Sequence, residues 1–183
     1  MKKLFLLIFI LMCSQITARA EEDINTGMIS GEGYSYILTA PKGWILDSQS
    51  GLSQGLHAVF YPAGSSWENG EVVCYTNAVL LVNTENIDDV MKRDMDKFKK
   101  DSPNLKAEPK GLIFIEVEKQ AKVVYFGGDA NNSYLATAYI PEQKAIVLIY
   151  LSTKTEEEFS KNIEAFHALV KSYSFLTDKA TEQ

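Results

Sequence analysis

Apolar and polar residues alternate along the chain in two groups of short segments. The first group covers residues 33–40, 44–46, 57–61 and 72–82, and the second covers residues 112–118, 122–126, 133–140 and 145–152. Their aromatic and β-branched residues, and the Gly, Pro, Asn and Ser at their ends, are typical of strands. The connections within the second group are too short for crossover helices, so its strands are predicted to pair antiparallel. Residues 145–151 are apolar on both faces, which predicts a central strand.

Two other segments have the period of a helix. The first presents one apolar face and a charged opposite face, and the apolar residues are Ile87, Val90, Met91, Met95 and Phe98. Asn86 is predicted to cap this helix and Pro103 to prevent its continuation. In the second segment Thr155 and Glu158 have the spacing of a capping box, and an apolar stripe follows at Phe159, Ile163, Phe166 and Val170. Strands in two groups with two helices predict an α+β fold.

The first twenty residues have the pattern of a secretory signal peptide. Lys2 and Lys3 precede an apolar run that is too short to span a bilayer, and Ala18-Arg19-Ala20 fits a cleavage site. An alternative makes Cys13 a lipid-modified residue, but the bulky Met12 precedes it. We therefore expect a periplasmic or secreted chain with a flexible arm at residues 21–31, a single domain at residues 32–176 and a frayed tail at residues 177–183.

Charge and cysteine content restrict the functions that the chain can have. Removing Lys2, Lys3 and Arg19 from the 18 basic residues leaves 15 against 24 acidic ones, a net charge of −9 after cleavage. Such a surface repels nucleic acid and anionic lipid, and no membrane segment is expected after cleavage. Only Cys74 remains, so an intrachain disulfide is excluded, and its strand-like surroundings favour a buried thiol.

The residues whose side chains could take part in catalysis do not form a recognised catalytic set. A thiol hydrolase that uses Cys74 with His57 is the one enzymatic alternative, and nothing near Cys74 would lower its pKa. His167 lacks partners at metal-ligand spacing, and residues 129–133 alternate oxygen donors without the remaining features of a calcium loop. No phosphate-binding glycine pattern is present. We therefore predict no catalytic residues, no metal site and no cofactor.

Aromatic residues supply the candidate binding site. Tyr61 and Trp67 flank a Pro-Gly-Ser loop, and exposed aromatic residues beside flexible polar ones can form a protein-binding surface. The competing interpretation is a loop that packs Trp67 on the edge of the sheet. The segment "APKGW" is predicted to be a corner between strands, because Pro41 cannot donate to a sheet, Gly43 permits a turn and Trp44 anchors the chain.

Three short segments resemble the PsbP-like family of small secreted domains. They are "GYSYILTAPKGW" (residues 33–44), "HAVFYP" (residues 57–62) and "FHALVKSYSF" (residues 166–175). The resemblance implies an αβα sandwich with a central, mostly antiparallel sheet and two main helices. It also implies a non-catalytic module for binding, assembly or stabilisation. Some members of the family bind divalent cations, and the family offers no shared catalytic set.

These observations favour a secreted or periplasmic, non-enzymatic module that engages another envelope or secreted protein, with Tyr61 and Trp67 as its binding residues. A carrier that holds a small ligand in a cavity between sheet and helices is the alternative from another class. The Cys74/His57 hydrolase is the third hypothesis.

Overall fold

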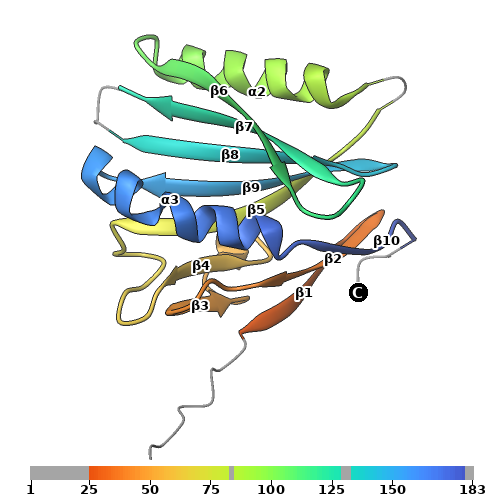
Figure 1. Ribbon diagram of the computed structural model, residues 1–183, viewed down its shortest axis with the longest axis horizontal. Helices are drawn as coiled ribbons and strands as arrows, with labels where there is room; N and C mark the ends of the chain where they lie inside the picture. Colours follow the sequence, from red (N-terminus) through yellow and green to blue (C-terminus); the bar gives the residue numbers. More distant parts are fainter. Residues whose placement is uncertain (1–24, 83–84, 129–132, 180–183) are drawn as a thin grey trace, which may run out of the picture.

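The computed structural model describes residues 25–82, 85–128 and 133–179 (Figure 1). The predicted signal peptide and most of the candidate calcium loop, residues 129–132, lie outside these ranges. A seven-stranded antiparallel sheet has the order β3 (Trp44–Asp47), β4 (Val59–Pro62), β5 (Val72–Leu80), β9 (Ala145–Thr153), β8 (Tyr134–Pro141), β7 (Gln120–Gly127), β6 (Lys106–Phe114). A second sheet has the order β1 (Thr26–Gly31), β2 (Tyr34–Thr39), β10 (Ser174–Thr177). The helices are α2 (Ile87–Asp101) and α3 (Glu156–Lys171), and η1 (Leu52–Gln54) is a short 3₁₀ turn.

The two long helices cover opposite faces of the large sheet, so the predicted αβα sandwich is confirmed (Figure 1). Alternate residues of the central strand β9 face the two helices. Val147, Ile149 and Leu151 join the cluster that contains Phe166 and Leu169 of α3, and the small sheet extends this cluster. On the other face, Ile146, Leu148 and Tyr150 pack in the cluster that contains Val90 of α2. The apolar character of β9 on both faces follows from this double burial.

Both helices begin where the sequence predicts. The Asn86 Oδ1 atom accepts hydrogen bonds from the backbone N–H groups of Asp88 and Asp89, and the Asp89 carboxylate accepts from the backbone N–H of Asn86. At α3, the Thr155 hydroxyl accepts from the backbone N–H of Glu158 at 3.1 Å. These caps satisfy backbone donors that have no partner within the helix.

The corner at residues 41–44 has the expected geometry. The Trp44 backbone N–H donates to the Pro41 carbonyl at 2.9 Å, and Gly43 has a φ of 78°. Trp44 is buried and packs in the cluster beneath α3. The structural interpretation of "APKGW" is thus confirmed.

The prediction of a flexible arm at residues 21–31 is wrong from Thr26 onward. Residues Thr26–Gly31 form β1, which pairs with β2 along its whole length, so the folded unit begins before residue 32. Small residues suit this strand because its glycines lie against large side chains. A Cβ atom at Gly31 would lie 2.3 Å from the Tyr34 hydroxyl oxygen. At the other end, β10 runs to Thr177, one residue into the predicted tail.

The predicted strand at residues 112–118 is displaced. β6 begins at Lys106 and ends at Phe114, and its register shifts between Pro109 and Gly111. Proline and glycine are normally strand breakers, but a proline is tolerated at a sheet edge and a bulge accommodates Gly111, which has a φ of 91°. The edge position of β6 explains why Pro109 and Gly111 were wrongly taken to lie outside the strand.

Candidate functional site

The structure gives Tyr61 and Trp67 separate partners. The Tyr61 hydroxyl donates to the Asp47 carboxylate at 2.9 Å, and the Trp67 ring meets the Tyr75 ring edge-on at a centroid distance of 5.8 Å. Both side chains are half-buried. Because Val59 pairs with Tyr75, alternation along β4 places Tyr61 on the same face of the sheet as Tyr75. Trp67 therefore packs on the sheet, and a binding role for the two residues stays a prediction.

The Cys74/His57 hypothesis is wrong. Cys74 is fully buried in the cluster beneath α3, where burial raises the pKa of its thiol far above the ordinary value. His57 is exposed and precedes β4. An attacking cysteine must ionise and be reached by its substrate, and this thiol has a raised pKa and no exposed surface.

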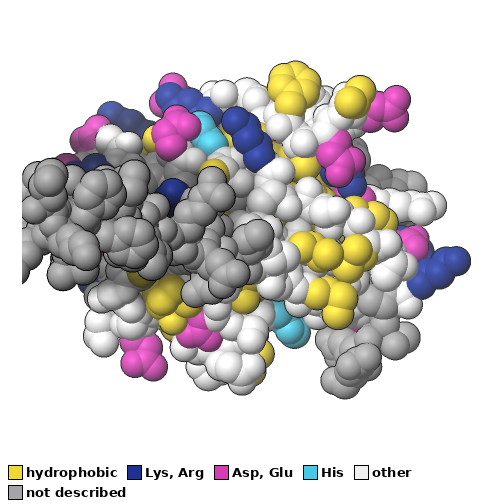
Figure 2. Space-filling view, turned by 60° about the horizontal axis from the view of Figure 1, so that its bottom comes forward, with side chains coloured by type: hydrophobic (Ala, Val, Ile, Leu, Met, Phe, Trp, Pro, Cys, Tyr) yellow, Lys and Arg dark blue, Asp and Glu magenta, His cyan; other side chains and the backbone are white. Residues whose placement is uncertain are grey.

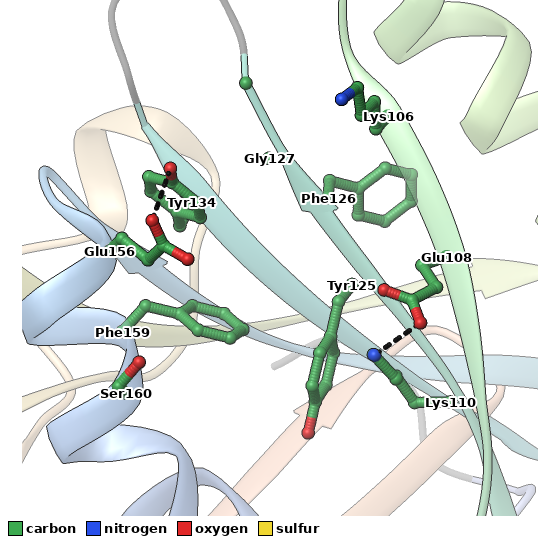
Figure 3. Close-up of a pocket in the computed structure, with 11 residues that line it drawn as sticks. Lys106, Glu108, Lys110, Tyr125, Phe126, Gly127, Tyr134, Glu156, Phe159 and Ser160 are labelled. Carbon is green, nitrogen blue, oxygen red and sulfur yellow. Dashed lines mark hydrogen bonds and ion pairs between the residues drawn. The ribbon is translucent and has the colours of Figure 1, made fainter.

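A surface groove between α3 and β6, lined by residues that the structure describes, is a candidate site (Figure 3). Its volume is about 440 Å³. β7 and the start of β8 form the floor, the first turns of α3 form one wall, and the first half of β6 forms the other. The lining residues are Lys106, Glu108, Lys110, Tyr125, Phe126, Gly127, Gly128, Tyr134, Glu156, Phe159 and Ser160. The groove exists because α3 covers the central strands and leaves this part of the sheet open.

Three aromatic rings give the groove its apolar surface. Phe159 points from α3 towards Tyr125 (Figure 3), and the two rings meet edge-on at a centroid distance of 5.1 Å. Tyr134 lies on the other side of Phe159, with ring centroids 6.0 Å apart. Such a cluster offers ring faces and edges to an incoming side chain.

Charged groups of both signs surround these rings. The Lys110 ammonium lies 5.4 Å from the centre of the Tyr125 ring and 2.5 Å from a carboxylate oxygen of Glu108. The Tyr134 hydroxyl donates to the Glu156 carboxylate at 3.2 Å. With Lys106, the groove carries two cationic and two anionic side chains. Its charge therefore favours neither an anionic nor a cationic ligand.

Tyr125 also contacts a histidine of α3. The Tyr125 hydroxyl lies 3.0 Å from the His167 Nε2 atom, and Glu164 lies 3.7 Å from the other ring nitrogen. Burial lowers the pKa of His167, opposed by Glu164, and Lys171 lowers it further. Burial also raises the pKa of the Tyr125 hydroxyl. A neutral imidazole that accepts from a protonated tyrosine fits these shifts, and it fixes the Tyr125 ring at the floor of the groove.

Sequence reasoning assigned Tyr125, Tyr134 and Phe159 to the right elements but did not bring them together. The alternation of β7 and β8 and the stripe of α3 were available signals, because they place these residues on facing surfaces. The wall formed by β6 had no such signal, since the bulge at Pro109–Gly111 shifts its register.

Two negative findings concern metal and membrane. Within residues 25–82, 85–128 and 133–179, no three His, Cys, Asp or Glu side chains gather in a way that could hold a metal ion. Over the same ranges, no helix combines the length and apolar character needed to cross a membrane.

The fold belongs to a known class. Over 84% of this chain, the structure matches the solution structure of the cyanobacterial PsbP protein, CyanoP, from Synechocystis sp. PCC 6803, with 94% of that chain covered, a TM-score of 0.55 and 17% identity. It also matches LpqN of Mycobacterium tuberculosis, described as involved in cell envelope biogenesis, over 84% of this chain and 91% of that one, with a TM-score of 0.54 and 16% identity. The chain therefore has the PsbP-like fold, as its motifs predict. No family model and no curated protein sequence matches it.

Proposed function

We propose that the protein is a non-enzymatic binding module of the periplasm or extracellular space, which holds an extended segment of a protein partner in the α3–β6 groove. The observation that carries this proposal is the groove itself, with its three aromatic rings and its mixed charged rim. An aromatic floor gains binding energy by burying an apolar side chain, and a rim with both charges orients the polar groups beside it.

The compartment is supported by two observations of different kinds. The first twenty residues have the composition of a secretory signal. LpqN, which shares the fold, is described as involved in cell envelope biogenesis. Fold similarity does not transfer function, so the proposal depends on the signal sequence and the groove, with the neighbour as support.

The test is to block the groove without removing any packing contact. Ser160 lines the groove and is exposed, so Ser160→Trp fills the space from the wall of α3. Lys161→Trp on the next, outward-facing position is the matched control. We expect affinity capture from the native host, under mild crosslinking, to recover a protein partner with wild type and with Lys161→Trp. Recovery should fall at least about tenfold with Ser160→Trp, which corresponds to about 1.4 kcal/mol. Equal recovery with both variants would show that the groove is not the binding site.

The loop with Tyr61 and Trp67 is a second surface for the same partner. Trp67→Ala should weaken capture while leaving the melting temperature nearly unchanged, because Trp67 is outside the buried core and its ring meets Tyr75 only edge-on. A large fall in melting temperature would instead assign Trp67 to the core, and unchanged capture would remove it from the binding surface.

A small-ligand carrier is the second candidate function, because a groove of about 440 Å³ lies within the size range of small-molecule sites. The spaces between sheet and helices are occupied by two side-chain clusters, so this ligand would bind in the groove. Native mass spectrometry of protein from its own host would detect it. A ligand lost with Ser160→Trp would favour the carrier over the protein-binding module.

A further inference from the structure

The end of β6 and the turn that follows it expose three large apolar side chains. The exposed fractions are 46% for Leu112, 67% for Phe114 and 100% for Val117. Single exposed apolar residues are common, but three within six residues at a sheet edge mark a surface that can pair with another strand.

Backbone geometry places free hydrogen-bonding groups at the same point. β6 is an outer strand of the large sheet among the described residues. The Ile115 backbone N–H donates to the Lys119 carbonyl at 2.9 Å, so it points towards β7. Because successive residues of an antiparallel strand alternate in direction, Ile113 also points towards β7, and the N–H and C=O groups of Leu112 and Phe114 point outward.

The first half of β6 is protected from the same kind of pairing. Pro109 has no N–H group to donate, and the bulge between Pro109 and Gly111 interrupts the regular spacing of backbone groups. Proline and bulges are the features by which sheet edges avoid association. The protection ends at Gly111, so the open segment is residues 111–115.

This segment is held in a fixed position. The Lys119 ammonium lies 2.6 Å from the Glu142 carboxylate and above the rings of Tyr173 and Phe175. The Tyr173 hydroxyl donates to the same carboxylate at 2.8 Å. These contacts tie the β6–β7 turn to the β8–β9 turn and to the chain after α3. A strand that is already ordered loses little entropy when it pairs.

We propose that the partner of this edge is a second copy of the same chain, paired antiparallel through β6 about a two-fold axis at Ile113. Leu112 of one copy then lies opposite Phe114 of the other. Both pairs exchange their outward N–H and C=O groups, which gives four backbone hydrogen bonds, and each pair brings two apolar side chains together.

Charge complementarity favours this antiparallel self-pairing. The start of β6 carries Lys106, Glu108 and Lys110, with a net charge of +1, and the turn after it carries Glu116, Glu118 and Lys119, with a net charge of −1. Antiparallel pairing places the basic start of each strand beside the acidic turn of the other copy. The contact is small, and each chain has a net charge of −9 after the expected cleavage, so the dimer is weak and its population depends on concentration.

Sedimentation velocity over a concentration series, with the purified protein, tests the proposal. We expect reversible dimers, and we expect Phe114→Lys to raise the dissociation constant at least about tenfold. Met28→Lys is the matched control, because Met28 is 69% exposed on β1 and Phe114 is 67% exposed. Phe114→Pro should have the same effect as Phe114→Lys while preserving the fold, since it removes the exposed ring and an outward N–H group but no hydrogen bond to β7.

A crosslink tests the register independently of any loss of stability. Ile113→Cys, in protein that begins at Glu21 and so lacks Cys13, should form an intermolecular disulfide under mild oxidation, because the pair at the axis has the short Cα separation that a disulfide needs. Met28→Cys should not. A monomer at every concentration, or equal behaviour of Phe114→Lys and Met28→Lys, would overturn the proposal. A monomer that loses capture of another protein with Phe114→Pro would assign the edge to that protein instead.

Discussion

At the scale of single residues, burial determines the protonation state of the reactive and titratable side chains. Cys74 lies in β5, paired with Leu151 of β9 and Phe60 of β4, and has no exposed surface. In such surroundings the thiolate has no water and no cation to stabilise it, so the pKa of the thiol is raised. The thiol acts as a small core side chain.

Cys74 should therefore be inert in the folded protein. We expect no measurable alkylation by iodoacetamide at pH 7–8.5 in native conditions, and rapid alkylation in denaturant. Mass spectrometry of the peptide that contains Cys74 distinguishes the two states. Fast modification of the folded protein, with a rate that rises with pH, would return the thiol enzyme to consideration.

Asp94 is a half-buried carboxyl with a stability cost. It accepts a hydrogen bond from the Tyr139 hydroxyl at 2.7 Å, and burial raises its pKa above the ordinary value of 3.8 despite that bond and despite Lys97 and Arg93. The folded state therefore retains a proton that the unfolded state has already released. Stability falls as pH rises through the interval between the ordinary and the raised pKa.

Asp94→Asn removes this dependence and keeps an oxygen for the Tyr139 hydroxyl. We expect the variant to gain stability relative to wild type as pH rises from 3.8 through the raised pKa, and to hold that gain at pH 7. Urea unfolding at several pH values measures the difference. A variant that loses stability steadily over the same interval would show that the charged form of Asp94 is stabilised.

At the scale of elements, the local sequence was sufficient to predict a helix start from its capping residue and a strand from its hydrophobic pattern. Asn86 and Thr155 predicted the starts of both helices, and the double apolar pattern of residues 145–151 predicted a central strand. β1 was missed because glycine, serine and threonine resemble a loop, although here they give room to Tyr34. β6 was displaced because a proline and a glycine inside a strand are tolerated only at an edge, and edge position is not visible in local sequence.

The cap of α2 provides a quantitative test at this scale. Asn86→Ala removes the acceptor for two backbone N–H groups and should destabilise the protein by about 1 kcal/mol. Lys92→Ala, on the exposed face of the same helix, should change stability by less than about 0.5 kcal/mol. Urea unfolding compares them. Equal effects would mean that packing alone determines where the helix begins.

At the scale of the whole molecule, the sequence predicted the class of fold but not the α3–β6 groove. The αβα arrangement follows from two amphipathic helices and a sheet that is apolar on both faces. The α3–β6 groove depends on how far α3 extends across the sheet and on the register shift in β6. Tyr125, Tyr134 and Phe159 come from three elements, so their meeting is a property of the assembled fold.

The central claim is that this groove holds a protein partner. A photo-crosslinking amino acid placed at Ser160, in protein expressed in its native host, tests it most directly. Equivalent positions at Trp67 and at the exposed Lys92 of α2 serve as comparisons. We predict a discrete crosslinked protein from Ser160 and none from Lys92. The absence of any product at Ser160, while Trp67 or Lys92 yields one, would contradict the account and place the binding surface elsewhere.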